Sequence, residues 1–216
     1  MAALLVATCA AAPTAAARPA SADDIPQILL SVDEVDTVVG APVAMDNPSS
    51  EPYQDFETDT PACAEAADIG LPSEFGGDGL AGFHISLMRD KPEKGGYFVK
   101  QVVGVFDGET EAAAAQRAVD SAVRGCLALG KPIEMTFPAG GSDPEHWAFK
   151  DLVSASNGIR WHKDEVREAN WQCDFASTAR SNLVLQAKVC EYSPTGAPLM
   201  KLLAEMTGRA DALKPA

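Results

Sequence analysis

The chain has 216 residues, of which 17 are basic and 31 acidic, and its formal net charge is −14. This length suits a single domain with one sizeable core. The acidic balance argues against nucleic acid and anionic membrane surfaces as partners, since both require a basic patch.

Residues 1–22, MAALLVATCAAAPTAAARPASA, differ in composition from the rest of the chain. An apolar run followed by Ala20-Ser21-Ala22, an A-x-A cleavage pattern, predicts a secretory signal peptide and a single mature domain over residues 23–216. No basic residue precedes the apolar run, so an Ala-rich linker or a start codon placed too late is the other interpretation.

The same segment predicts how the protein would meet a membrane. Residues 6–9, VATC, resemble a bacterial lipobox, in which Cys9 would carry a lipid. No other stretch approaches the roughly 18 apolar residues that a spanning helix needs. We therefore expect an extracytoplasmic protein, secreted or attached to the envelope, that contacts the membrane only through a lipid anchor at Cys9. The sequence does not predict an oligomeric state.

The first half of the expected mature chain alternates helical and extended patterns. Residues 29–40, LLSVDEVDTVVG, predict a capped helix, with Ser31 and Glu34 as a capping box and Gly40 at its end. Residues 61–72 favour one or two helical turns. Residues 82–90 and 97–106 predict two strands joined by a turn. Residues 110–130 form the clearest helix, with a face expected to include Ala115, Ala118, Val119, Ala122, Val123 and Cys126.

The next segment predicts a short strand over 133–137 and then a hairpin over 147–166. Asn157-Gly158 is a strong turn signal, and a turn centred on it pairs Lys150 with Glu165. Within this hairpin Arg160, Trp161 and His162 gather a guanidinium, an indole and an imidazole. These three residues are our candidates for the lining of a binding cleft, although a solvated strand with one tryptophan packed inward is the plainer interpretation.

Residues 171–190, WQCDFASTARSNLVLQAKVC, predict a second hairpin with a disulfide across it. The midpoint between Cys173 and Cys190 falls between Ser181 and Asn182, so a tight turn there places the two cysteines opposite each other, at a separation that suits a disulfide. Five cysteines are present. With Cys9 in the leader, four remain, and of their three connectivities this pairing leaves Cys63 with Cys126. Residues 197–214 predict a terminal amphipathic helix.

The chain lacks recognisable catalytic motifs, phosphate loops and metal-ligand spacings. We therefore predict no cofactor and no metal. A hydrolase is the least favoured class, with His146 or His162 as its candidate base. Terminal helices around a run of antiparallel strands indicate an α+β fold.

The opening helix at 29–40, the Cys63 to Cys126 spacing, the WQC with a cysteine seventeen residues later and the Ala/Leu-rich terminal helix occur together here. In this combination, the chain over residues 25–210 resembles the PknH-like extracellular sensor domains of mycobacterial receptor kinases, exported proteins and lipoproteins. The resemblance implies a twisted antiparallel sheet flanked by helices, two disulfides, and a cleft for an unidentified ligand. It supplies no catalytic residues.

The function expected from the sequence is therefore a non-catalytic sensor or ligand-binding domain of the cell envelope. Its partner would be an unknown small molecule or an envelope component. A structural or partner-binding envelope protein is the alternative, because nothing in the sequence requires a small ligand.

Overall fold

The computed structural model describes residues 18–45, 47–90, 96–139, 143–192 and 195–213. Cys9 and most of the expected leader lie outside these residues. In chain order the elements are η1 (Ala22–Asp24), α1 (Ile25–Ile28), α2 (Val32–Val39), β1 (Val43–Met45), β2 (Glu57–Thr58), η2 (Pro61–Cys63), α3 (Ala64–Ala67), α4 (Pro72–Phe75), β3 (Leu80–Asp90), β4 (Tyr97–Phe106), α5 (Glu109–Ala128), β5 (Ile133–Thr136), β6 (Glu145–Ala155), β7 (Gly158–Glu165), β8 (Trp171–Arg180), β9 (Leu183–Tyr192) and α6 (Ala197–Asp211).

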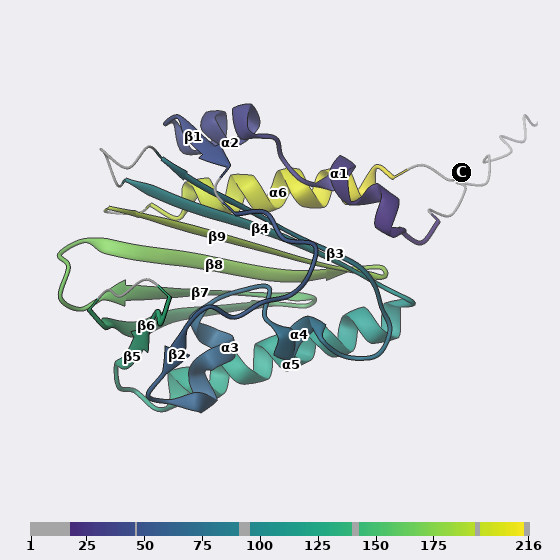
Figure 1. Cartoon of the computed structure of the whole chain (residues 1–216). Coiled ribbons are helices and arrows are strands. Elements are labelled where there is room, and N and C mark those ends of the chain that lie inside the picture. The colour runs from purple at the N-terminus through teal and green to yellow at the C-terminus, as the bar shows by residue number, and fades with distance from the viewer. Residues whose placement is uncertain (1–17, 46, 91–95, 140–142, 193–194, 214–216) are drawn as a thin grey trace, which may run out of the picture.

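The strands form one antiparallel sheet of nine in the order β1-β3-β4-β9-β8-β7-β6-β5-β2. Helices α1, α2 and α6 lie on one face and α3, α4 and α5 on the other, so the sheet is the middle of three layers (Figure 1). Each face buries its own apolar cluster. The expected α+β class, a twisted antiparallel sheet flanked by helices with two disulfides, is confirmed.

The local signals explain where the helices begin and end. In α2 the Ser31 backbone N–H donates to the Glu34 carboxylate at 2.8 Å, and Gly40 ends the helix with a φ of 74°, a left-handed conformation that glycine adopts without strain. In α5 the buried stripe differs from the predicted one and runs through Ala112, Gln116, Val119, Val123 and Cys126. The stripe is displaced because Gln116 points inward and accepts a hydrogen bond from Ser177 at 2.7 Å.

Both disulfides are present in the structure. Cys173 and Cys190 are direct partners on β8 and β9, across the two-residue turn at Ser181 and Asn182. Cys63 is joined to Cys126, which ties η2 and the start of α3 to α5. The pairing expected from the hairpin midpoint is therefore the one observed.

The hairpin of β6 and β7 forms, but its predicted register is wrong. Lys150 pairs with His162 and not with Glu165, and the strands turn through Ser156 and Asn157. Gly158 is the first residue of β7, and glycine is required there because a Cβ would come within 2.8 Å of the Ser177 carbonyl oxygen on β8. A bulge at Asp151, whose φ is 54°, shifts the register further.

Candidate functional site

Strand pairing brings charged side chains together on the face of the sheet that α3 and α5 cover. Directly opposed residues of an antiparallel sheet point to the same face. Two neighbouring rows of such residues cross the sheet from β3 to β7: the first is Arg89, Phe98, Cys190, Cys173 and Lys163, and the second is Leu87, Lys100, Lys188, Phe175 and Trp161. The first row thus places Lys163 beside the Cys173–Cys190 disulfide, and the second places Lys100 and Lys188 beside aromatic residues.

The carboxyl end of α3 meets these two rows. The last carbonyls of a helix have no partner within the helix and need one elsewhere. Here the Trp161 indole N–H donates to the Ala66 carbonyl at 2.9 Å, and the Lys163 Nζ donates to the Ala67 carbonyl at 2.7 Å. The next residue, Asp68, accepts from two further lysines. Three consecutive residues of this segment are therefore held by the sheet.

Asp68 holds two ammonium groups with one carboxylate. Lys100 Nζ lies 3.0 Å from Oδ2, and Lys188 Nζ lies 3.1 Å from Oδ1. All three residues are buried, as is Lys163, which is 1% exposed. Among the residues with described coordinates, none offers Lys163 an ion pair. Buried charges are normally neutralised by a partner, so this group of four carries an excess of positive charge.

Aromatic rings face each of the three ammonium groups. Lys163 Nζ lies 4.1 Å from the centre of the Trp147 ring, and Lys188 Nζ lies 4.5 Å from that of Phe98. Lys100 Nζ lies 5.1 Å from the ring centre of Tyr53, in the loop before β2. The negative face of an aromatic ring attracts a cation at these distances. The rings therefore compensate part of the cost of burying these charges.

Burial and charge shift the pKa values of these groups. Burial alone would raise the pKa of Asp68, but the Lys100, Lys188 and Lys163 charges outweigh it and hold that pKa well below its usual range. Burial lowers the pKa of Lys163 well below that of a free lysine, and the neighbouring Lys188 charge lowers it further. Burial also lowers the pKa of Lys188, against the raising effect of Asp68. The positive charge is thus held at an energetic cost.

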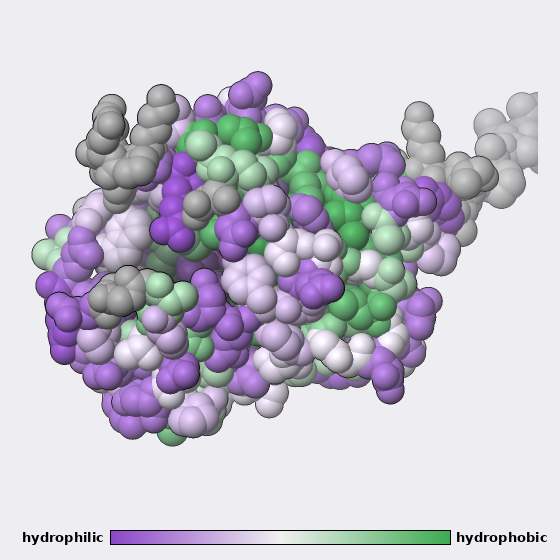
Figure 2. Space-filling view, viewed as in Figure 1, coloured by the Kyte–Doolittle hydropathy of each residue, from purple (hydrophilic) through white to green (hydrophobic). Residues whose placement is uncertain are grey.

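These four residues form the floor of a cleft of about 420 Å³, which the loop residues Tyr53 and Asp55 before β2 also line. We call it the lysine cleft and define it by Lys100, Lys163, Lys188 and Asp68. The space-filling view shows a recess on the left of the molecule (Figure 2), on the side where β5 and the start of β8 lie in Figure 1. The volume falls within the range typical of small-molecule sites. Apolar and aromatic side chains complete its walls: Tyr53, Leu87, Phe98, Met135, Phe137, Trp147 and Trp171.

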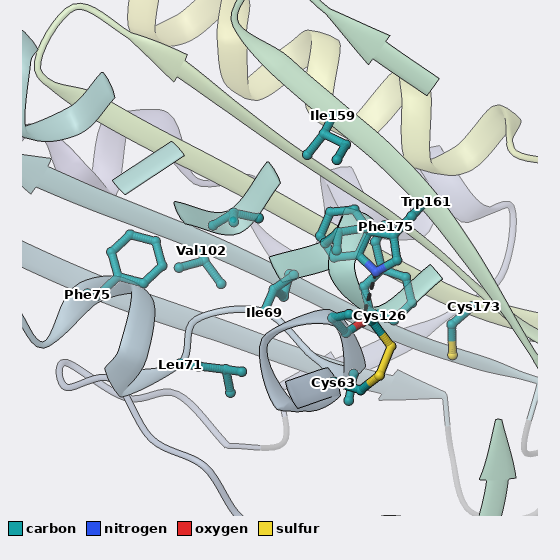
Figure 3. Packing of buried hydrophobic residues seen from close by; sticks show 14 of the residues in the cluster. Cys63, Ile69, Leu71, Phe75, Val102, Cys126, Ile159, Trp161, Cys173 and Phe175 are labelled. Carbon is teal, nitrogen blue, oxygen red and sulfur yellow. Dashed lines mark hydrogen bonds between the residues drawn. A yellow bond between two sulfur atoms is a disulfide. The ribbon is translucent and has the colours of Figure 1, made fainter. Parts of the chain in front are cut away.

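The candidates from the sequence, Arg160, Trp161 and His162, lie elsewhere. They border a second cavity of about 150 Å³ beside the start of α6, with Asp174 and Leu199. Trp161 is 1% exposed and stacks on Phe175 with ring centres 5.0 Å apart. Figure 3 shows this pair close to the Cys63–Cys126 disulfide, with the indole N–H hydrogen-bonded. The Arg160 and His162 side chains face the side of the sheet that carries α6, where Arg160 contacts Met200 and His162 contacts Asp174, whereas the Trp161 indole faces α3 on the other side. The structure therefore does not bring the three side chains together, and as ligand contacts they remain a prediction.

The environment of His162 bears on the hydrolase interpretation. Its Nδ1 lies 2.8 Å from Asp174 and its Nε2 lies 2.6 Å from Asp164. Burial lowers the pKa of His162, but the two carboxylates outweigh burial and raise it. Two carboxylate partners favour a ring protonated on both nitrogens, which has no lone pair for a general base. His146, the other candidate, contacts Glu134 and Arg167.

The described part of the chain contains no group of three or more His, Cys, Asp or Glu side chains arranged to hold a metal ion. Over the same part, none of the helices has the length and apolarity to cross a membrane.

Sequence reasoning missed the lysine cleft, although strand parity contained the signal. Lys188 is two residues from Cys190, so it shares a face with the disulfide, and Lys163 stands in the same relation to Trp161. A lysine on the buried face of a strand is unusual unless it is paired. Nothing in the sequence indicated Asp68, because it lies in a loop, and a loop has no periodic pattern from which its position over the sheet could be predicted.

Taken together, fold and cleft define a class: a small disulfide-bonded domain with a ligand-sized cleft that has a charged floor. The model of the PknH-like extracellular domain family matches residues 20–209, and the chain belongs to this family. The crystal structure of the extracellular domain of PknH from Mycobacterium tuberculosis is similar, with a TM-score of 0.81 and 18% identity over 91% of this chain and 99% of that one. At that identity the likeness shows the fold.

A putative uncharacterized protein from Mycobacterium smegmatis is also similar, at 10% identity over 86% of this chain and 97% of that one, with a TM-score of only 0.36. A search of curated proteins finds no match to the chain.

Proposed function

We propose that this protein is an extracytoplasmic, non-catalytic binding domain of the cell envelope, and that it senses or holds a small ligand in the lysine cleft. The family is one of extracellular domains, and the two disulfides suit an oxidising compartment. Cleft shape alone would be weak support. The observation that carries the proposal is the cleft floor, where three lysines are buried beside a single carboxylate that pairs with only two of them, Lys100 and Lys188.

The cost of that floor is the argument for a ligand. Taking a charged group out of water costs several kcal/mol, and apolar residues of similar volume often give a more stable protein. A fold that needed only stability would place leucine or methionine at these positions. Charges kept at such a cost beside a cleft of ligand size favour a binding role.

The proposal is tested by a thermal-shift or native mass spectrometry screen against cell-envelope metabolites and peptides. A cleft-filling variant, Ala139→Trp, tests whether the ligand binds in the lysine cleft, because Ala139 lines it. Ala155→Trp, at an exposed position on β6, is the matched control. We expect a ligand whose binding is lost in Ala139→Trp and kept in Ala155→Trp. If no small molecule binds and pull-down recovers one stoichiometric protein, the binding-domain proposal is wrong and a partner-binding role replaces it.

A further inference from the structure

The charges of the lysine cleft are arranged in two levels. The buried floor holds three lysines and Asp68, a formal balance of +2 with every lysine protonated. The rim holds three more charged residues, Arg89, Asp55 and Glu145, a balance of −1, and these are exposed or half-buried. The chain as a whole carries −14. The floor is thus positive although the protein as a whole is strongly acidic. The cleft interior therefore favours a negatively charged ligand.

The floor also has more hydrogen-bond donors than acceptors. Each ammonium group offers three N–H donors, nine for the three lysines. The described residues provide four acceptors for them: two oxygens of Asp68, the Ala67 carbonyl and the Met135 sulfur, which lies 3.5 Å from Lys163 Nζ. Five donors are left for aromatic faces and for whatever enters the cleft.

Lys163 and Lys188 are the two ammonium groups best placed to share a ligand. Their Nζ atoms lie 5.4 and 5.5 Å from the centre of the same Phe175 ring. Lys188 and Lys100 share the Asp68 carboxylate, whereas Lys163 pairs with no described carboxylate. An anionic group between them would supply the acceptors that the floor lacks, in charge-assisted hydrogen bonds.

We propose that the ligand of the lysine cleft is a small soluble organic anion, with a carboxylate or phosphate on the floor beside Lys163 and Lys188. Its apolar or aromatic body lies against Phe98, Phe137 and Trp171 on the walls. This inference rests on the proposed function, because it names the ligand class of the same cleft. The two ammonium groups repel a cation in that position, and the apolar walls favour a flat or apolar acid.

Three probes of nearly identical shape test the charge: benzoate, benzamide and benzamidinium, which are anionic, neutral and cationic. Phenyl phosphate tests the second anionic group. Binding is followed by protein-observed NMR at millimolar probe, the range in which fragments of this size bind, at constant ionic strength. We expect benzoate and phenyl phosphate to shift resonances of Trp147 and Trp171, and to bind about tenfold more tightly than benzamide. Benzamidinium should bind most weakly.

Two variants locate the charge. Lys163→Met should lower benzoate affinity to that of benzamide, whereas Lys150→Met, an exposed lysine outside this cleft, should change neither. The comparison of the three probes on the unaltered protein holds even if a variant fails to fold. Preference for benzamidinium or benzamide in the cleft overturns the anion proposal and leaves the binding function standing. Absence of binding by all four probes, together with an empty metabolite screen, contradicts both.

Discussion

Lys100 and Lys188 lie directly opposite each other on β4 and β9, and each donates to a different oxygen of the Asp68 carboxylate. Like charges directly opposed across strands destabilise a sheet. The pair therefore depends on Asp68, which comes from the segment after α3 and not from the sheet. The cleft floor is thus held together by a contact between distant parts of the chain.

Asp68→Asn tests that dependence. Removing one partner of a buried ion pair leaves uncompensated charge, which typically costs about 3–5 kcal/mol. We expect a loss of this size at neutral pH, measured by urea unfolding. Because the folded-state pKa of Asp68 is depressed, the stabilisation by its carboxylate is present above the ordinary pKa of about 4 and is lost as pH falls toward the folded value. The variant should lack this acid-dependent component. An equal acid dependence in both proteins would contradict the assignment.

Lys163→Met should have the opposite effect on stability. Its ammonium is buried without a carboxylate partner among the described residues, so an apolar side chain of similar length should raise the free energy of unfolding by roughly 1–2 kcal/mol. Lys150→Met, at a lysine whose side chain is 54% exposed, should change it by less than about 0.5 kcal/mol. A gain in stability accompanied by loss of benzoate binding would assign Lys163 a binding role. A large loss of stability would instead make it structural.

Glu74 gives a pH-dependent prediction outside the cleft. Burial raises the pKa of Glu74 to about 8, against the lowering effect of its hydrogen bond from Gln186. Between about pH 4.3 and the folded-state value, the folded carboxyl keeps a proton that the unfolded chain releases. Stability therefore falls as pH rises through this window, by at most about 1.4 kcal/mol per pH unit.

Glu74→Gln removes this titration, so its stability relative to the unaltered protein should increase steadily from mildly acidic pH toward pH 8 in urea unfolding. Glu205→Gln, at an exposed position on α6, is the control and should run parallel to the unaltered protein. Parallel curves for Glu74→Gln would show that Glu74 ionises normally.

Export is a further prediction. The protein recovered from the envelope or the medium should begin at Asp23, or at a lipidated Cys9, as read from its intact mass; a cytoplasmic protein that keeps Met1 would contradict both. In the structure the Ala20 backbone exchanges two hydrogen bonds with the Asn182 side chain, at 2.9 and 2.8 Å. A chain that begins at Asp23 lacks these bonds, so we expect it to be less stable than one that begins at Arg18 by about 1–2 kcal/mol.

The sequence predicted local structure well because its signals are local. The Cys173–Cys190 pairing followed from a midpoint, and the ends of α2 from its Ser31 and Gly40 caps. The predicted register of β6 and β7 was wrong because Gly158 was interpreted as a turn residue. It is a strand residue that must be glycine for close packing on β8. That contact joins two hairpins, and no pattern within one hairpin reveals it.

The lysine cleft was missed for a related reason. Parity along β7 and β9 places Lys163 and Lys188 on the buried face, and this much was available from the sequence. They form a site only because Asp68 lies over them and pairs with Lys188. The position of Asp68 depends in turn on α3, which the Cys63–Cys126 disulfide holds in place. Long-range placement of a short loop segment leaves no periodic signal, whereas the cluster of Arg160, Trp161 and His162 was conspicuous because it is contiguous.

The last prediction separates the roles of the two disulfides. In the chain-entropy model, closing the 63-residue separation of Cys63 and Cys126 stabilises by about 4 kcal/mol, and the 17-residue separation of Cys173 and Cys190 by about 3 kcal/mol. Replacing either pair with alanine should therefore cost similar amounts in urea unfolding. Only the first pair anchors α3, whose Ala66 carbonyl accepts the Trp161 indole N–H.

Loss of Cys63–Cys126 should therefore speed hydrogen exchange of the Trp161 indole N–H, measured by NMR, and weaken benzoate binding. Loss of Cys173–Cys190, whose cysteines remain in register on paired strands, should leave that exchange rate nearly unchanged under conditions where both variants are folded. Equal acceleration in the two variants would mean that they differ only in global stability. In that case α3 would not depend on its disulfide for its position over the cleft.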